Sequence, residues 1–425
     1  MKKKIVLTAF SVLLAASTVY GSGYRIPEQS TNSIALGGAY VAHTMGPDTA
    51  YFNPAAMSWQ EDAGQIELSL TYINLPRIDY DDNRSSAYDG DSDLEQFLLP
   101  LIHMVSKDYN KFRFGFSLAY PAGLTKQWGE PFPKGASDEF NLKVIEGNPS
   151  ISYKICDRFS IAAGFRILHA DGTVKSTATS PTRLPPYLAG ATLSRDLEGD
   201  TTEFGYNLAM SLRPTDNWTI GVTYRSKVDL DLTADSAKLQ FHDANGNPLY
   251  PDYRDTGRVS VPVPAVVAIG TSYTFFDKTT VELSWDRTFW HEYDDLDFEY
   301  EQDFDFAGHP FQAFDRPSEK DWRNSDAYRI GITHRCTDRF TAMCGFAIDS
   351  NPIPERTVNF ELPDSDAKLY AFGGRYQYSE KLSIGAAYFF YDKESRNIRN
   401  NDNGIDGEFD GAGAHVVNMG FNYTF

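Results

Sequence analysis

The last ten residues, VVNMGFNYTF, place an apolar side chain at every second position up to the end of the chain, from Val417 to Phe425. Successive side chains of a strand point to opposite faces, so this stretch predicts a strand with one wholly apolar face. An exposed stripe of that kind would invite aggregation. The fold must therefore cover both this face and the edge of the last strand.

The same alternation recurs along the chain, in units of two alternating runs joined by a tight turn. Five stretches show it: SYKICDRFSIAAGFRI, MSLRPTDNWTIGVTYR, TSYTFFDKTTVELSW, THRCTDRFTAMCGFAI and GRYQYSEKLSIGAAYFF. Each turn carries Asp, Glu or Asn beside a cation or an amide, which is typical of β-hairpins. The faces opposite the apolar stripes carry charges and glycines. A series of antiparallel hairpins is expected.

The connections between these hairpins differ at the two ends of the strands. One set is tight, whereas the other is long, acidic and irregular, and aromatic residues cluster at strand ends, as in Phe389–Tyr391. These features are typical of outer-membrane barrels, whose apolar faces meet lipid and whose closure leaves no free edge. The sequence predicts an all-β, fourteen-stranded antiparallel transmembrane β-barrel. The strands are expected near 65–77, 97–106, 111–127, 140–154, 158–175, 201–213, 217–231, 257–275, 279–290, 326–335, 339–349, 366–378, 381–392 and 413–425.

The N-terminus has the pattern of an export signal. Three lysines, Lys2–Lys4, precede the apolar run IVLTAFSVLLAAS, and Val19 and Gly21 fit the positions before a cleavage site. The run is too short for a spanning helix and polar sequence follows it directly. We therefore expect a signal peptide over residues 1–21, Ser22 as the first mature residue, and a location in the outer membrane of a Gram-negative cell.

Composition excludes several classes of function. The formal net charge of -19 and the pI near 4.8 argue against a nucleic-acid partner. The three cysteines match no zinc pattern and no GxSxG turn is present, so we expect no metal, no cofactor and no enzymatic activity. We expect the acidic loops to form a solvated surface rather than a calcium site. A general porin and a structural adhesin are among the classes that these observations leave open.

Residues 22–63 break the strand pattern. They are rich in Gly, Ala, Ser, Asn and Pro, and they contain short helical runs such as SIALGGAYVA. Fourteen strands enclose a lumen wide enough to need filling if the barrel is not to leak. We therefore predict an N-terminal hatch, or plug, over 22–63, followed by the barrel over 64–425. A flexible leader is the alternative.

These motifs carry a resemblance to a known family. GYRIPEQS, ALGGAYVA, DTAYFNPAAM, VPVPAVVAIGTSYTF, GFAIDSNPIPERTVNFELPDSD and the terminal GFNYTF follow one another in the order seen in the FadL family of outer-membrane transporters. The resemblance covers essentially the whole mature chain. It implies a hatched barrel that carries long-chain fatty acids or related lipophilic molecules inward by diffusion. It further implies capture at the loops, an apolar pocket and a sideways exit at a kinked third strand. The outer-membrane lipid and lipopolysaccharide would surround it, and Phe425 resembles the terminal signal read by the barrel assembly machinery.

The third predicted strand, FRFGFSLAYPAGLTKQWGE, contains both a proline and a glycine. Pro121 removes a ladder donor and Gly123 permits unusual dihedral angles, so regular pairing is expected to fail locally. A bulge without function is the plain alternative. The resemblance places the lateral opening here, at Pro121 and Gly123.

The resemblance also suggests gate residues. It places the mature tip, Ser22, Gly23 and Tyr24, in the ligand pocket, with Tyr24 as the candidate gate or, alternatively, a packing aromatic. Asn53, Pro54 and Ala55 form the family's Asn-Pro-Ala motif, which is expected to fix the fold of the hatch.

Several residues are candidates for ligand binding. A ligand carboxylate would need a cation in an apolar pocket, and the resemblance points to Lys175 with the neighbouring Ser176, and to Arg323. Without such a cation the pocket would suit neutral hydrocarbons better. The long-loop stretch RLPPYLAGATL is apolar for an exposed connection and could form a capture groove or roof the barrel. Its candidate residues are Leu184, Tyr187, Leu188 and Leu193.

Overall fold

The computed structural model describes residues 23–180, 188–304 and 308–425. The predicted signal peptide, Ser22, Leu184 and Tyr187 lie outside the described residues.

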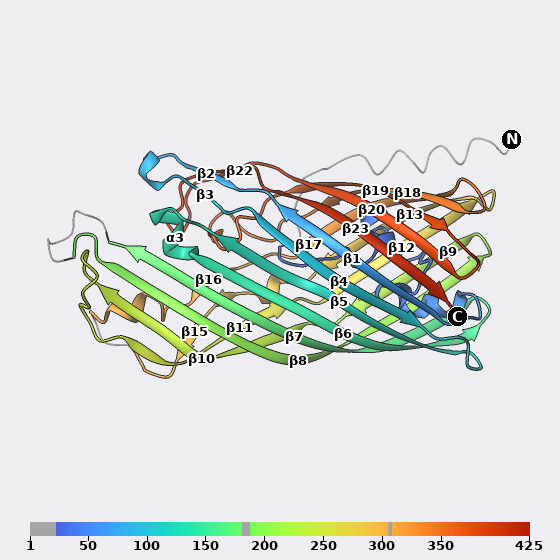
Figure 1. Ribbon diagram of the computed structural model, residues 1–425, viewed down its shortest axis with the longest axis horizontal. Helices are drawn as coiled ribbons and strands as arrows, with labels where there is room; N and C mark the ends of the chain where they lie inside the picture. Colours follow the sequence, from blue (N-terminus) through green and yellow to red (C-terminus); the bar gives the residue numbers. More distant parts are fainter. Residues whose placement is uncertain (1–22, 181–187, 305–307) are drawn as a thin grey trace.

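Fourteen antiparallel strands form a closed barrel, as the sequence predicts (Figure 1). Closure is made by the first and last strands, which pair from Gln65 opposite Thr424 to Asn74 opposite His415. Two of the fourteen are interrupted, one at Ser226 and Lys227 and the other at Pro264 and Ala265. The strands are β1 (Gln65–Leu75), β4 (Glu95–Val105), β5 (Phe112–Gln127), β6 (Glu139–Cys156), β7 (Phe159–Thr179), β8 (Thr192–Thr215), β9 with β10 (Trp218–Arg225, Val228–His242), β11 with β12 (Tyr253–Val263, Val266–Phe275), β13 (Thr279–Thr288), β17 (Ser325–Arg335), β18 (Phe340–Asp349), β19 (Ala367–Gln377), β20 (Leu382–Lys393) and β23 (Gly413–Thr424).

The terminal apolar stripe lies on the outer face of this barrel. Val417, Met419 and Phe421 are about half exposed, and β23 is paired on both sides, with β20 and β1. The backbone N–H of Phe425 donates to Gly64 O at 2.9 Å while its ring stays exposed. The last strand therefore has no free edge, and only its apolar face needs cover from outside the protein. Recognition of Phe425 by an assembly machinery stays a prediction.

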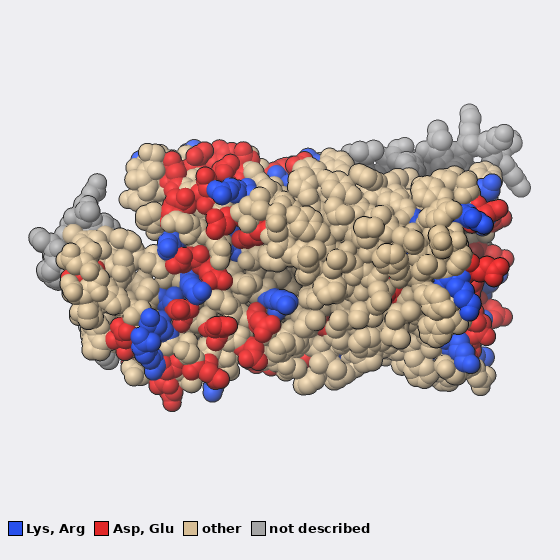
Figure 2. Space-filling model, in the orientation of Figure 1, with Lys and Arg blue, Asp and Glu red and all other residues tan. Residues whose placement is uncertain are grey.

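Charge divides the outer surface into zones. Figure 2 shows Lys, Arg, Asp and Glu gathered over the end that carries the long loops and on a narrow rim at the end with the tight turns, with an uncharged belt between them. Exposed apolar side chains lie on strands throughout this belt: Leu68, Leu70, Phe114, Phe116, Phe165, Phe204, Leu208, Met210, Leu283 and Phe372. In the described ranges no helix is long and apolar enough to cross a membrane.

The strands extend further into the loop end than the sequence indicates. Residues 176–199 and 232–256 were expected to be loops, but β7 continues to Thr179, β8 begins at Thr192, β10 reaches His242 and β11 begins at Tyr253. In β10 the apolar residues of this extension face inward, and their alternation with polar residues slips at Asp235 and Ser236, so no unbroken alternating run marks the strand.

Short elements lie among the loops. A four-stranded sheet joins β21 (Arg396–Ile398), β22 (Gly407–Asp410), β2 (Asp79–Asp82) and β3 (Gly90–Asp91), and β14 (Asp295–Leu296) pairs with β16 (Ser318–Glu319). β15 (Phe298–Tyr300) extends the barrel wall beside β11. Four further elements are helical: η2 (Ser86–Tyr88), α3 (Pro131–Ser137), η3 (Trp290–Glu292) and η4 (Pro310–Ala313).

The N-terminal segment, residues 23–63, packs against the inner faces of the strands (Figure 1). It contains α1 (Thr31–Ala35), which Ser30 and Ser33 begin with a reciprocal capping box, then α2 (Thr49–Phe52) and η1 (Pro54–Trp59). Between α1 and α2, Glu282 of β13 accepts the backbone N–H groups of Val41, Ala42 and His43, at 2.6 to 2.8 Å. A wall carboxylate thus satisfies three consecutive donors of an irregular stretch.

Glycines on the wall let this segment approach the strands closely. A Cβ on Gly345 of β18 would lie 2.1 Å from the backbone carbonyl of Leu36. A Cβ on Gly221 would meet Val41 O at 2.4 Å, and one on Gly420 would meet Thr31 Oγ1 at 2.3 Å. At Gly345 and Gly221 only glycine fits, because two backbones touch there.

We therefore expect Gly345→Val to destabilise the protein by about 1–3 kcal/mol, because the obstructing atoms belong to backbone that cannot move aside. The midpoint of thermal unfolding measures the effect. Gly147→Val is the matched control, since a Cβ there meets only Phe116 Cε2, at 3.9 Å. Equal midpoints for the two variants would contradict a tight contact between segment and wall.

Candidate functional site: an apolar cavity at a gap in the barrel wall

The wall opens between β4 and β5. In the described structure the ladder between these strands is limited to Ile102–Val105 opposite Gly115–Leu118. Beyond it β4 stays paired with β1 and β5 with β6, but not with each other. We call the gap between 95–101 and 119–126 the window.

The window coincides with an irregularity in β5. Pairing with β6 is regular up to Ala119, shifts over Tyr120 and Pro121, and resumes with Ala122 opposite Val144. The shift reverses the alternation, so that odd-numbered residues face inward before it and even-numbered residues, such as Leu124, face inward after it. Pro121 lies within this bulge and Gly123 directly follows it.

The N-terminal segment pairs with the free edge of β5. The N–H of Ile26 donates to Pro121 O at 2.9 Å, and the N–H of Gly123 donates to Tyr24 O at 3.0 Å. The Gln29 amide both donates to Tyr120 O and accepts from Tyr120 N, each at 2.8 Å. Residues 24–29 therefore replace part of the ladder that β4 does not supply.

Aromatic rings surround Tyr24 at the tip of the segment. Its ring centroid lies 4.6 Å from that of Trp290, 5.7 Å from Trp322 and 6.3 Å from Tyr293. Burial, followed by the nearby Tyr293 and Asp229, raises the pKa of Tyr24 well above its usual value. The phenol stays protonated and donates to Pro262 O at 2.5 Å.

Gly23, the residue before Tyr24, is also held by a hydrogen bond. The N–H of Gly23 donates to Asp364 Oδ2 at 2.9 Å, and Asp364 also pairs with Lys393. Gly23 has φ +67°, and a Cβ there would lie 3.0 Å from the Trp290 ring, so glycine is required on both counts.

A cavity of about 550 Å³ lies beside the tip and extends into the window. Its lining is mainly apolar and comes from both faces of the wall, with Leu99 and Leu124 on the inner face and Leu98 and Gly123 on the outer face. Gly23 and Tyr24 also line it. The cavity therefore connects the space around the tip with the outer surface of the barrel.

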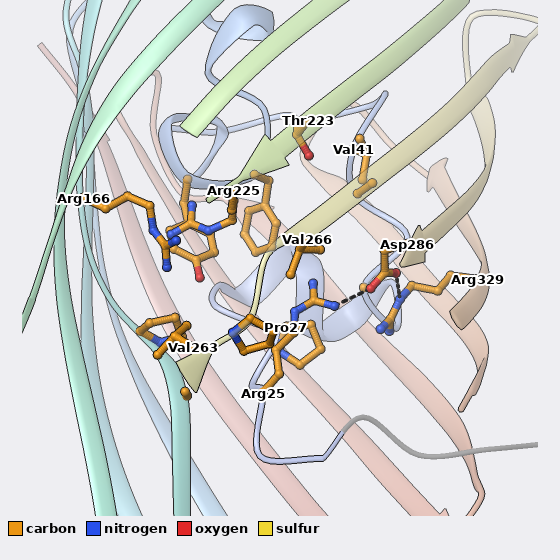
Figure 3. A pocket seen from close by; sticks show the side chains of 17 residues that line it. Arg25, Pro27, Val41, Arg166, Thr223, Arg225, Val263, Val266, Asp286 and Arg329 are labelled. Atoms are coloured by element: carbon orange, nitrogen blue, oxygen red, sulfur yellow. Dashed lines mark hydrogen bonds and ion pairs between the residues drawn. The ribbon is translucent and has the colours of Figure 1, made fainter. Parts of the chain in front are cut away.

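A charged layer adjoins this cavity and shares Arg25 and Pro27 with its lining; Figure 3 shows the layer. Arg25 donates to Asp286 at 2.5 Å, and Arg329 donates to the other oxygen of Asp286 at 2.9 Å. Across a small pocket of about 70 Å³, Arg166 and Arg225 both pair with Glu146. Buried charges are stable only when they are paired in this way. An apolar molecule gains no favourable contacts in such a layer, so the layer is a poor route for it.

The Asn-Pro-Ala stretch holds the N-terminal segment together. The Asn53 amide donates to Val41 O at 2.8 Å, Pro54 begins η1, and Ala55 O accepts the Ser160 hydroxyl of β7 at 2.8 Å.

The predicted ligand-binding residues lie elsewhere. Lys175 is partly exposed and pairs with Glu139 at 2.7 Å, while the buried Ser176 hydroxyl donates to Ala136 O. Arg323 is exposed, and its backbone N–H donates to Pro352 O. Leu193 packs against the apolar core of the loop end, and Leu188 O accepts from Ala191 N. None of these five is among the described residues that line the cavity.

Three cations that line the cavity from inside were not singled out from the sequence. They are Arg25, Lys126 and Lys393. Lys126 could have been found by counting residues beyond Pro121, because a bulge of one extra residue changes which side chains face inward.

Comparison with known proteins identifies the family. The family described as "Outer membrane protein transport protein (OMPP1/FadL/TodX)" matches residues 12–425. A long-chain fatty acid transport protein of Salmonella typhi is 22% identical, over 98% of this chain and 97% of its own length. Outer membrane protein P1 of Haemophilus influenzae is also 22% identical, over 90% of this chain and 89% of its own length.

Solved structures show the same fold. A Pseudomonas aeruginosa FadL homologue superposes with a TM-score of 0.79 at 21% identity, covering 95% of this chain and 99% of its own. The Pseudomonas putida toluene transporter TodX gives a TM-score of 0.70 at 18% identity, covering 96% and 99%. With the family matched over nearly its whole length, this chain belongs to the OMPP1/FadL/TodX family of outer membrane proteins that transport hydrophobic compounds.

Proposed function

We propose that this protein takes up uncharged lipophilic molecules by passive diffusion and releases them sideways through the window between β4 and β5. The observation that carries the proposal is the cavity, which begins beside Tyr24 and continues between the two strand edges to the outer surface. Transport on this route needs no chemical step, since an apolar molecule moves from one apolar environment to another.

The start of the route lies at the loop end. Large apolar side chains from several strands fill the barrel there, among them Leu168, Leu197, Leu230 and Phe298. Leu193 packs against this cluster, which supports a capture surface that leads inward, although the same contacts suit a simple roof of loops. Leu188 and Leu193 remain candidates for capture.

The tip of the N-terminal segment is the proposed gate. Gly23–Ile26 line the cavity and hold the β5 edge through two backbone hydrogen bonds, so a ligand that enters must compete with them. Tyr24 adds its hydrogen bond to Pro262. Below the tip, the segment and the charged layer act as a plug, which leaves the window as the exit.

The charges on the inner side of the cavity favour an uncharged ligand, while Lys143 lines it from the outer face. Each of the three inward cations is already matched by a carboxylate: Arg25 by Asp286, Lys126 by Glu95 and Lys393 by Asp364. A ligand carboxylate would have to displace one of these partners. Long-chain fatty acids, alcohols and hydrocarbons all fit the route when neutral, whereas an ionised fatty acid is the second candidate, favoured by the named relatives.

Equilibrium binding to the purified, refolded barrel tests this proposal. At pH 8 we expect saturable binding of a long-chain alcohol at least as tight as that of the fatty acid of equal length, with toluene as a small aromatic comparison. Lys175→Ala and Arg323→Ala should change neither affinity more than about twofold, since exposed charges contribute little.

Two outcomes would contradict the proposal. A clear preference for the ionised acid that either substitution removes would restore a cation-assisted fatty acid site. A lack of saturable binding by every ligand in the panel would refute transport through this cavity altogether.

A further inference from the structure

An ion pair joins the two edges of the window at its end nearest the loops. Lys126 faces inward from β5, and Glu95, the first residue of β4, faces it with Nζ to Oε2 at 3.5 Å. The two side chains are 5% and 8% exposed. Just beyond them the edges rejoin, as Asp93 N donates to Gln127 O at 2.9 Å.

The hydrogen bonding of this pair is incomplete. Within the described ranges, both carboxylate oxygens of Glu95 are buried, and their contacts with the Lys126 ammonium and the Gln127 backbone fall short of good hydrogen-bond geometry. The Lys126 ammonium has three donors, yet its contacts with Glu95 and with Ser92 Oγ are both 3.5 Å long. Buried charged groups are expected to be fully hydrogen-bonded. The pair thus offers incompletely used donors and acceptors beside an apolar cavity, which Lys126 lines and Glu95 adjoins through Lys126.

The charges decide which molecule could complete the site. The pair is neutral as a whole, so an anion would be repelled by Glu95 and a cation by Lys126. A neutral head group that carries both an acceptor and an O–H satisfies both residues, accepting from Lys126 and donating to Glu95. An ester or ether can accept but cannot donate, and a hydrocarbon can do neither.

We propose that Lys126 and Glu95 form a head-group site that holds a long-chain alcohol or a protonated fatty acid at the window. The inference rests on the proposed lateral route and adds the head-group class that the route prefers. The tail extends along Leu99 and Leu124 toward the outer surface at Leu98. The ion pair is therefore more than a tether between two strand edges.

The test compares 1-hexadecanol with its methyl ether, which has the same chain and acceptor but no donor. Binding is measured for the wild type and for Lys126→Met/Glu95→Leu, a replacement that leaves no unpaired charge. We expect the wild type to prefer the alcohol about tenfold, the effect of one good charge-assisted hydrogen bond. In the double variant the preference should fall to about one, because the alcohol loses two hydrogen bonds and the ether, which can only accept from Lys126, loses one.

Lys175→Met/Glu139→Leu is the matched control, because it removes a Lys–Glu pair from the wall outside the cavity. It should keep the wild-type preference. An unchanged preference in the window variant, or an equal loss of both ligands, would overturn the proposal and leave the pair as a tether. Equal binding of both ligands to the wild type would also overturn it. Failure of both ligands to bind the wild type would instead refute the proposed function.

Discussion

Gly123→Trp is expected to slow uptake of a long-chain alcohol at least about tenfold, the effect of an added barrier of about 1.4 kcal/mol. Gly123 lines the window, and a Cβ there has only Ile26 Cδ1 and Leu142 O within 4 Å. An indole would therefore cover the outer mouth of the gap and pack against its apolar edges. Moving the ring aside would forfeit its packing contacts, of about 0.1–0.2 kcal/mol each, and roughly ten of them supply that barrier. Uptake of a radiolabelled alcohol by cells that express the variant measures the effect.

Gly147→Trp provides the control for this experiment. Gly147 lies on β6, outside the window, and faces the outer belt, so the same added ring meets surroundings outside the barrel instead of the gap. Its uptake rate should match the wild type. Ligand binding should persist in both variants. Gly123→Trp obstructs only the exit, and neither substitution removes the contacts of Tyr24. Wild-type uptake by Gly123→Trp would contradict exit through the window.

The barrel could be predicted from the sequence because its outer face is exposed to an apolar medium. That exposure imposes strict alternation on strands such as β23, with Met419 and Phe421 pointing outward. The same reasoning fails above the belt, where the alternation in β10 slips at Asp235 and Ser236 and the strand up to His242 is divided into two short runs.

The break in regular pairing at Pro121 could be predicted from the sequence, but the polar contacts beside it could not. Pro121 and Gly123 act on their own backbone, so their local effect can be read without a structure. The partner of Lys126 depends on the bulge that turns it inward and on Glu95, thirty-one residues earlier in a different strand. Lys175 and Arg323 are predicted by analogy with the family. In the structure Lys175 pairs with Glu139 and Arg323 is exposed, both away from the cavity.

Arg329→Ala is expected to loosen the N-terminal segment and to reduce stability by about 3–5 kcal/mol, the usual effect of breaking a buried ion pair. The Arg329 guanidinium donates to Glu28 at 2.9 Å, to Gly37 O at 3.0 Å and to Asp286 at 2.9 Å. Asp349 lies 3.6 Å away. The substitution leaves these buried carboxylates without their shared cation and removes an anchor between segment and wall. Thermal unfolding measures the loss, and planar-bilayer recordings should show a steady ion current absent from the wild type.

Arg287→Ala separates the effect of burial from that of losing an arginine. Arg287 pairs with Asp326 at 2.7 Å on the neighbouring strands, but its side chain is 41% exposed, so the expected cost is below about 1 kcal/mol. It should also leave the barrel closed to ions. If Arg329→Ala kept wild-type stability and remained closed, the charged layer would not hold the segment in place. If Arg329→Ala instead showed an ion current but normal stability, this ion cluster would seal the barrel without stabilising it.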